Sequence, residues 1–297
     1  MIDLSIVIVS YNTRDLITKC LDSIKETIKD SSYEVFIIDN DSSDDSIKII
    51  KDYIREDKSK KVYFVENNKN LGFSKANNKA MKKAKGRYIL FLNPDTVVYP
   101  KTLDYMVKYM DENKNVGAAT CELIMPNGEI DDATHRGFPT PWNSFCHFLG
   151  ISKLLPHTKL FSGYSQGWKD LTKTHEIDAL AGAFMIVRRE AGDEAGWWDE
   201  DYFFYGEDLN FCYELIKKGW KIMYIPEVRI LHYKGVSGGL KKVSKEITTA
   251  DKEVKKRATK ARFDAMKIFY KKNYEDKYPK FLTKLVMLGI SLKEKTS

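Results

Sequence analysis

Side chains that suit metal and phosphate chemistry follow each of four apolar stretches in the first third of the chain. They are SYNT at 10–13, DNDSS at 39–43, NNKNLG at 67–72 and NPD at 93–95. A carboxylate such as Asp95 is a hard oxygen ligand of the kind that Mg²⁺ or Mn²⁺ prefers, and such a cation can neutralise a diphosphate. No G-x-G-x-x-G or G-x-x-x-x-G-K-[ST] motif is present to cradle phosphates instead. A β-turn would also explain Pro94-Asp95, but not the other three polar segments.

A second acidic group, Glu207-Asp208, follows an aromatic-rich run at 197–205 and begins a stretch whose apolar spacing predicts a helix to residue 218. A carboxylate in this place suits general-base catalysis, and the aromatic run indicates a site enclosed by aromatic side chains. Acidic residues also stabilise a helix N-terminus through the helix dipole. Taken alone, the pair fits either role.

The elements that must position these residues alternate between strands and helices. Apolar strands are predicted at 4–10, 33–39, 61–66 and 87–93, and helices at 14–29, 42–54 and 72–84. Apolar strands joined by helices form parallel sheets, whose ligands bind at the carboxyl ends of the strands. The predicted fold class is therefore α/β, with the polar segments at one edge of the sheet.

The second half of the chain is less regular. A strand and a Pro-Asn-Gly turn are expected within 116–130, strand-like segments at 176–190 and 221–239, and a basic helix at 243–272. Residues 131–175 have no clear period, which is typical of long lids and binding loops, and we expect them to select the acceptor. Arg188 and Arg189 either cap a strand end or pair with an anionic substrate.

The charge pattern concerns the partners of the protein. The 297 residues carry a net charge of +7, and the Lys-rich stretches lie after residue 240. They indicate either an anionic partner, such as a membrane surface or a phosphorylated substrate, or a solvated helix face. The apolar stretch 281–292 is too short to span a bilayer and fits either an interfacial helix or a packed one. No nucleic-acid partner is expected, and a homodimer is an open alternative.

Cysteine use and the N-terminus indicate the compartment. The four cysteines form no C-x-x-C pair, and no signal peptide is recognised. We expect a cytoplasmic protein with reduced thiols, in which Cys20 and Cys212 are buried.

Seven segments occur in an order that resembles family 2 glycosyltransferases with the GT-A fold, and within them the rhamnosyltransferase-like branch. They are SIVIVSYNTRDLITKCLDSI, VFIIDNDSSDDS, NKNLGFSKANNKAM, YILFLNPDTVVYP, ALAGAFMIVRRE, FFYGEDLNFCYELIKKGW and ILHYKGVS. The resemblance implies a mostly parallel central sheet flanked by helices, with a helical C-terminal tail. It implies an inverting transfer of a sugar, with rhamnose favoured, from a dTDP- or UDP-linked donor to an acceptor hydroxyl. The implied setting is cell-surface polysaccharide assembly, with a lipid-linked acceptor. Apart from the resemblance, the basic tail is expected to contact either the cytoplasmic membrane face peripherally or a neighbouring subunit.

The resemblance also implies roles for single residues. Asp208 would be the catalytic base, with Glu207 beside it. Asp95 would bind the divalent metal cofactor, Mn²⁺ or Mg²⁺, and His232 would be a second metal ligand. Lys234 and Ser237 would close over the diphosphate. The residues implied in nucleotide binding are Tyr11, Asn12, Asp39, Asn70, Asn77, Asn93 and Asp95.

Several of these roles have simpler alternatives. Asp39 would read a pyrimidine N3–H, but it would also fit a cap of the next helix. Tyr11 would flank the base or pack in the core, and His232 would end a strand without binding metal. Asn93 stands where the metal motif of the family more often has Asp.

The predicted organisation is a catalytic domain at 1–240, with a nucleotide-binding part at 1–95 and an acceptor-binding part at 96–240, followed by a basic helical tail at 241–297. Two other functions fit the same features. One is a non-catalytic protein that binds nucleotide or carbohydrate. The other is a sugar-nucleotide pyrophosphorylase, although SYNTRD stands where such enzymes resemble one another in a Gly-rich basic loop.

Overall fold

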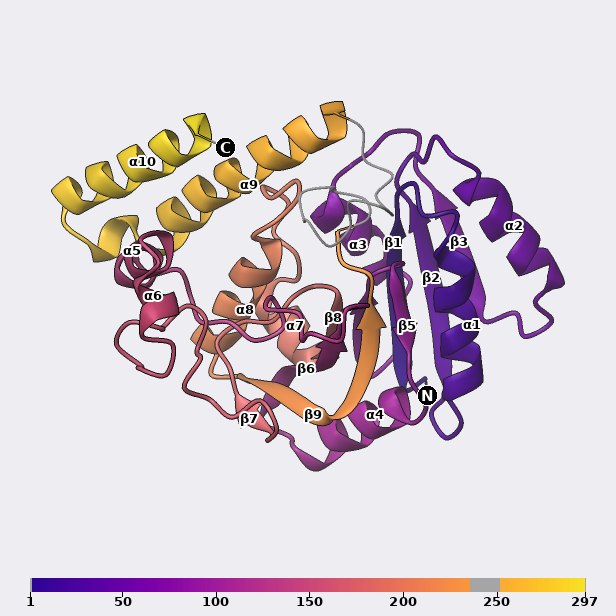
Figure 1. Cartoon of the computed structure of the whole chain (residues 1–297). Coiled ribbons are helices and arrows are strands. Elements are labelled where there is room, and N and C mark those ends of the chain that lie inside the picture. The colour runs from indigo at the N-terminus through magenta and orange to yellow at the C-terminus, as the bar shows by residue number, and fades with distance from the viewer. Residues whose placement is uncertain (1, 236–251, 297) are drawn as a thin grey trace.

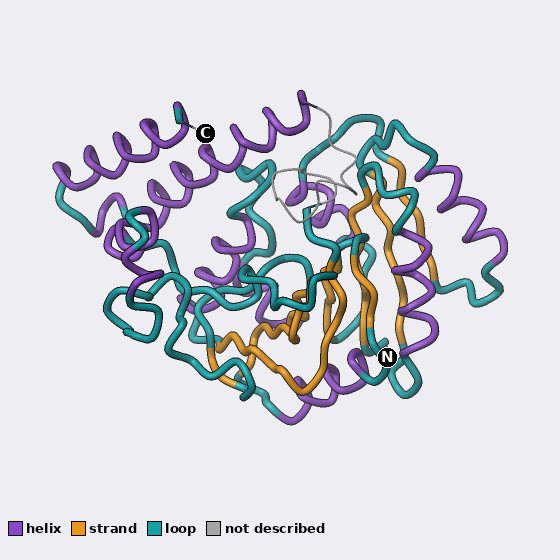
Figure 2. Tube along the Cα trace, in the orientation of Figure 1, coloured by secondary structure: helices purple, strands orange, loops and turns teal. Residues whose placement is uncertain are grey.

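A single mixed sheet, covered by helices on both faces, forms the centre of the computed structural model, which describes residues 2–235 and 252–296 (Figures 1 and 2). Its strand order is β3-β2-β1-β4-β8-β6-β9-β5, and β7 pairs with β9. The strands are β1 (Leu4–Ser10), β2 (Tyr33–Asp39), β3 (Val62–Glu66), β4 (Tyr88–Leu92), β5 (Thr96–Val98), β6 (Val116–Ile124), β7 (His175–Glu176), β8 (Phe184–Arg188) and β9 (Lys221–His232). β1 to β4 are parallel, whereas β8 runs antiparallel to both of its neighbours.

The two faces of the sheet bury separate cores because successive side chains of a strand point to opposite faces. Leu4, Ile6 and Ile8 of β1 belong to one core and Val7 to the other. The first core is covered by α1 (Ile17–Thr27), α2 (Ser46–Glu56) and α4 (Thr102–Glu112). The second is covered by α3 (Phe73–Met81), α7 (Arg189–Ala195) and α8 (Glu207–Lys217). The sheet is thus buried on both sides, as its apolar strands predict.

The remaining helices lie at one end of the molecule (Figure 1). They are α5 (Pro141–Phe148), α6 (Ile151–Leu154), α9 (Lys252–Asn273), the 3₁₀ turn η2 (Glu275–Lys277) and α10 (Lys280–Lys295). Thr140 caps α5 by accepting a bond from the Asn143 N–H, and Pro141 occupies its first turn. A third apolar cluster, including Tyr202, Ala265 and Phe269, fastens α9 to the loop before α8.

Two glycines bring the halves of the chain into contact. Gly72 has a φ of 82°, and a Cβ there would lie 2.5 Å from the carbonyl oxygen of Phe203. Gly206 has a φ of 81° directly before α8, and its Cβ would lie 3.0 Å from that of Ala265. Positive φ and close contact both favour glycine. The loop that leads into α8 is therefore held against α3 on one side and α9 on the other.

The ends of the predicted strands in the first half are confirmed to within one or two residues. The ends of the helices between them are confirmed to within about four residues. Strand 176–190 is wrong in extent: β8 covers only Phe184–Arg188, and α7 begins at Arg189. The segment before β8 forms no continuous ladder, because its backbone has three different partners. The Ile177 N–H donates to the Ile222 carbonyl, Ala179 and Arg136 exchange two backbone bonds, and the Ala183 carbonyl accepts from the Asn93 N–H. Helices α4, α5 and α6 were not expected. The predicted helix start at 243 and Ser237 lie outside the described residues, and Cys20 and Cys212 are buried as predicted.

Candidate functional site

Asp95 lies between β4 and β5, where the sheet brings it next to the end of β9. Its backbone carbonyl accepts a bond of 2.9 Å from Tyr233 N–H, and Thr96 is paired with His232 across the two strands. The Asp95 Oδ1 and His232 Nε2 atoms are consequently 3.5 Å apart. Both side chains are buried, at 6% and 5% exposure. The sequence prediction that these two residues act together is thus geometrically possible.

His232 is held from its other side by an acid that the sequence did not single out. Its Nδ1 is 2.9 Å from Asp131 Oδ2, and Asp131 also pairs with the Lys234 ammonium group. Burial opposes the charged imidazole, but Asp95 and Asp131 outweigh this effect and raise the pKa of His232 to about 9. Burial likewise opposes charge on Asp131, yet its two cationic partners lower its pKa. The site therefore favours positive charge close to Asp95.

The donor atoms around Asp95 fit a divalent cation. With a pKa of about 9, His232 is protonated near neutral pH when no cation is bound, so a metal ion would have to displace the Nε2 proton. Nδ1–H donates to Asp131, and the buried Nε2 has no hydrogen-bond partner. A carboxylate that orients a histidine ligand in this way is a recurrent feature of metal sites. No cluster of three or more His, Cys, Asp or Glu side chains arranged to hold a metal occurs within 2–235 and 252–296. Asp95 and His232 would thus supply two ligands, and phosphate oxygens and water the others.

The ends of β1 and β2 are joined by a hydrogen-bonded network. Asp39 is fully buried and accepts bonds from the backbone N–H and the hydroxyl of Ser42, at 2.9 and 2.6 Å. Ser42 in turn accepts a bond from Asn12 N–H, and the Asn12 amide oxygen accepts one from Ser43 N–H. Burial raises the pKa of Asp39. Asp39 thus shapes its own turn, while Tyr11 lies half-buried beside it.

The predicted asparagines differ in their surroundings. The Asn70 amide oxygen accepts bonds from Asn40 and from Gly72 N–H, at 2.9 and 3.0 Å. Asn77 is buried and donates to the Phe73 carbonyl within its own helix, at 2.9 Å. Asn93 is only half-buried, next to Asp95. Asn70 and Asn93 therefore lie at the strand ends, whereas the donor group of Asn77 is occupied by α3.

Glu207 and Asp208 form the first turn of α8 and have different partners. Asp208 Oδ2 lies 2.6 Å from the Nη2 of Arg136, and both side chains are largely buried. Glu207 is buried, and its Oε2 has no hydrogen-bond partner. Burial and the adjacent Asp208 charge raise the pKa of Glu207 to about 8. Glu207 therefore keeps its proton near neutral pH.

Residues 131–136, DDATHR, connect the two acidic centres. Asp131 orients His232 opposite Asp95, and Arg136 holds Asp208. Arg136 also donates to the Leu180 carbonyl at 3.0 Å, while the Ala183 carbonyl three residues later accepts from Asn93 N–H at 2.9 Å. The segment before β8 therefore links the Asp208 end of the site to the Asn93 end through residues only three positions apart. Sequence reasoning missed Asp131 and Arg136 because their partners are 72 to 101 residues distant.

Arg188 ends β8 and Arg189 begins α7, both at the opposite end of the sheet from Asp95. Arg188 donates to the carbonyls of Val116, Met110 and Asn113. Arg189 donates to the carbonyls of Gly86 and Ala84. They cap strand and helix ends, which is the structural role that the sequence left open.

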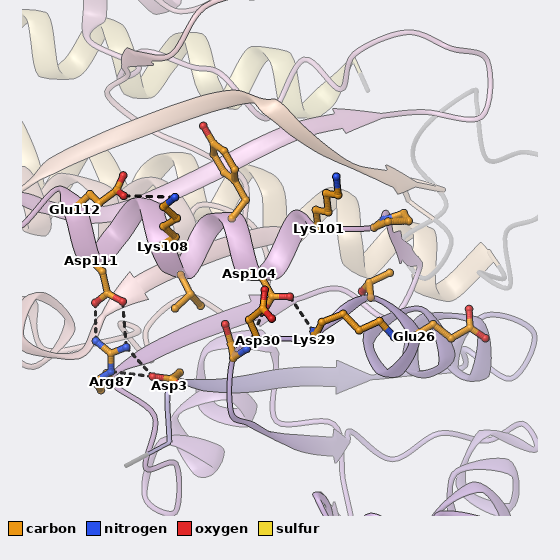
Figure 3. Close-up of a pocket in the computed structure, with 15 residues that line it drawn as sticks. Asp3, Glu26, Lys29, Asp30, Arg87, Lys101, Asp104, Lys108, Asp111 and Glu112 are labelled. Carbon is orange, nitrogen blue, oxygen red and sulfur yellow. Dashed lines mark hydrogen bonds and ion pairs between the residues drawn. The ribbon is translucent and has the colours of Figure 1, made fainter.

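A surface hollow of about 840 Å³ lies at the amino ends of β1 and β4, away from Asp95 (Figure 3). Several of its charged groups have partners within the protein: Arg87 pairs with Asp3 and Asp111, each at 2.6 Å. Asp104 accepts bonds from the backbone N–H groups of Lys29 and Ser31. Since these groups already have partners, we assign the hollow no role in binding.

Comparison with known proteins identifies the family. The model of glycosyl transferase family 2 matches residues 5–191. The chain belongs to this family. Rhamnosyltransferase WbbL of Escherichia coli (strain K12) is 29% identical to this glycosyltransferase over 231 residues, which cover 77% of this chain and 82% of WbbL. The N-acetylglucosaminyl-diphospho-decaprenol L-rhamnosyltransferase of Mycobacterium tuberculosis is 26% identical over 152 residues, covering 51% of this chain and 48% of that enzyme.

Solved structures confirm the GT-A fold. TarS of S. aureus (residues 1–349) has a TM-score of 0.54 at 15% identity, covering 93% of this chain and 73% of that one. GalNAc-T7 with UDP, GalNAc and Mn²⁺ has a TM-score of 0.59 at 17% identity, covering 94% and 52%. The recognised family and the mostly parallel sheet with C-terminal helices are thus confirmed. Within the described residues, no helix is both long enough and apolar enough to cross a membrane.

Proposed function

We propose that this glycosyltransferase moves a sugar from a dTDP- or UDP-linked donor to an acceptor hydroxyl with inversion, in cell-surface polysaccharide assembly. The observation that carries the proposal is the DDATHR segment, which ties the Asp95–His232 pair to the Asp208 carboxylate. Inverting transfer needs a base for the acceptor proton and positive charge at the departing diphosphate. The two ends of this segment supply these requirements.

Asp208 is the proposed base. It would take the proton from the acceptor hydroxyl as the oxygen attacks the anomeric carbon. Arg136 fixes the orientation of Asp208 through the bond of 2.6 Å, and the neutral form of Glu207 avoids a second adjacent charge. The acceptor hydroxyl would donate to a remaining lone pair of the Asp208 carboxylate, whose two oxygens accept from Arg136 and from Leu209 N–H.

The opposite end of the site would hold the diphosphate. Lys234 is the cationic side chain nearest to the Asp131–His232 pair, and Asp95 with His232 would hold a divalent cation, Mn²⁺ or Mg²⁺. That cation, when bound, neutralises charge on the leaving diphosphate. Carboxylate with imidazole suits Mn²⁺ better than Mg²⁺, which prefers oxygen ligands alone.

The nucleoside would lie over the ends of β1 and β2. Asp39, which still has free lone pairs beside its Ser42 bonds, would accept from the pyrimidine N3–H, with Tyr11 against the base. Asn12, Asn70 and Asn93 would line the ribose and phosphates, and Asn77 would support them through α3. Residues 1–95 thus form the nucleotide part and 96–240 the acceptor part. The similarity to two rhamnosyltransferases, one of which acts on an N-acetylglucosaminyl-diphospho-decaprenol, favours rhamnose as the sugar and a lipid-linked saccharide as the acceptor.

Isothermal titration with dTDP, UDP and GDP, each with and without Mn²⁺, tests the donor half of this proposal. We expect Mn²⁺-dependent binding of one pyrimidine nucleotide, lost in Asp95→Ala and retained in Asp30→Ala, which removes an exposed carboxylate in the distant hollow. Equal affinity with and without Mn²⁺ would contradict the cation site. Absence of binding by all three nucleotides would contradict the donor assignment.

A further inference from the structure

An apolar ridge runs along the outer side of α10. It consists of Phe281, Leu285, Leu288 and Leu292, which are 68%, 58%, 56% and 55% exposed. Steps of four, three and four residues return to nearly the same direction in a helix with about 3.6 residues per turn. Four large apolar side chains are therefore aligned and open to the surroundings.

The opposite side of α10 holds the helix in this orientation. Val286 and Met287 pack on the cluster formed by α9 and the loop before α8. Thr283 lies 3.2 Å from the Tyr270 hydroxyl of α9. α10 therefore has two apolar faces, one packed on the domain and the other formed by the exposed ridge. Packing within the described residues does not explain why the ridge is apolar.

Helices α5 and α6 expose further apolar side chains at the same end of the molecule (Figure 1). They are Trp142, Phe145, Phe148, Leu149 and Leu154, from 46% to 81% exposed. His147 of α5 is close enough to Arg262 of α9 for that charge to help lower its pKa, although burial is the larger cause. Exposed apolar surface, here on α10 and on α5–α6, marks a site of interaction with another protein or a membrane.

Charge distinguishes between these partners. Residues 252–296 contain fourteen Lys and Arg against five Asp and Glu, an excess larger than the net charge of +7 of the whole chain. Lys280, Lys284 and Lys293 are exposed beside the ridge. Pairing of two copies through the ridge would bring these lysines together, and four side chains cover far less than the roughly 800 Å² per partner of a stable interface. An anionic surface with an apolar interior satisfies both features.

We propose that the ridge and its lysines dock this glycosyltransferase on an anionic lipid bilayer, with α10 lying in the plane of the interface. The ridge enters the boundary between head groups and acyl chains, and the lysines contact lipid phosphates. This surface is separate from the Asp95 and Asp208 site, so the docking proposal does not depend on the proposed reaction.

Vesicle sedimentation of the full chain tests the docking surface. The vesicles contain either phosphatidylcholine alone or equal parts of phosphatidylcholine and phosphatidylglycerol. The ridge variant carries Phe281→Ser, Leu285→Ser and Leu288→Ser; the matched control carries Tyr63→Ser and Ile216→Ser, which also remove exposed apolar side chains. All substituted positions are open to solvent, and circular dichroism checks that each variant is folded.

We expect the wild-type protein and the control to bind the anionic vesicles, less so at high salt, and the ridge variant to bind about tenfold more weakly or less. Lys280→Glu with Lys284→Glu should also weaken binding. Equal binding by the wild type and the ridge variant would overturn the proposal, as would absence of wild-type binding. A wild-type dimer that becomes monomeric in the ridge variant, with no vesicle binding by either, would identify a second copy as the occupant instead.

Discussion

Replacing Glu207 with Gln should stabilise the protein at alkaline pH. The folded protein holds the Glu207 proton with a pKa of about 8, because the side chain is buried next to the Asp208 charge, whereas the ordinary value is 4.5. Between these two values the folded state binds more protons than the unfolded state, so this group makes the free energy of unfolding fall as pH rises. The cost is absent below about pH 4.5 and complete above about pH 8, where it reaches at most about 5 kcal/mol. Gln keeps the shape of the side chain and cannot ionise.

Chemical unfolding of the wild type and Glu207→Gln across this pH range measures the effect. The two proteins should be about equally stable near pH 5, and the variant should become more stable by several kcal/mol near pH 9. Glu190→Gln is the matched control, because Glu190 also lies in the first turn of a helix but is exposed. A constant difference between wild type and Glu207→Gln at all pH values would refute the assignment of a neutral, buried Glu207.

Two further predictions concern the DDATHR segment. Arg136→Met leaves the Asp208 carboxylate buried without its partner and should lower the free energy of unfolding by about 3–5 kcal/mol, measured by denaturant titration. Adding Asp208→Asn to Arg136→Met should restore much of the lost free energy of unfolding. If the losses caused by the two substitutions simply add, the ion pair is contradicted. Asp131→Asn should weaken Mn²⁺-dependent nucleotide binding about 10- to 100-fold in calorimetry, because His232 loses its orienting carboxylate. Asp132→Asn, at an exposed acid, should change this affinity much less; equal effects of the two variants would argue against orientation of His232 by Asp131.

The strands that carry the site could be predicted from the sequence because each is apolar on both faces and is bounded by polar turns. β1 and β2 have the predicted bounds, and Asp39, Asn70, Asn93 and Asp95 occupy the predicted strand ends. Segment 176–190 misled the prediction, since its apolar residues are buried without forming a continuous ladder. Burial rather than strand pairing explains its composition.

The residues that orient the site could not be predicted in the same way. Asp131 and Arg136 lie in a segment without periodicity, and their partners come from β9 and α8, far along the chain. Only the pairing of β6 with β9 and the packing of α8 bring them together. Local patterns identify the chemical groups, whereas the topology decides which of them meet.

Turnover by Asp208→Asn tests the central claim most directly. The assay measures release of dTDP or UDP from dTDP-rhamnose or a UDP-hexose in the presence of a lipid-linked saccharide acceptor, alongside nucleotide affinity by calorimetry. If Asp208 is the general base, the variant should lose about 10²- to 10⁴-fold in turnover while its nucleotide affinity stays close to that of the wild type. Turnover equal to that of the wild type would contradict the assignment of the base. A wild-type protein that binds the nucleotide sugar but releases no nucleotide with any acceptor would contradict catalysis itself.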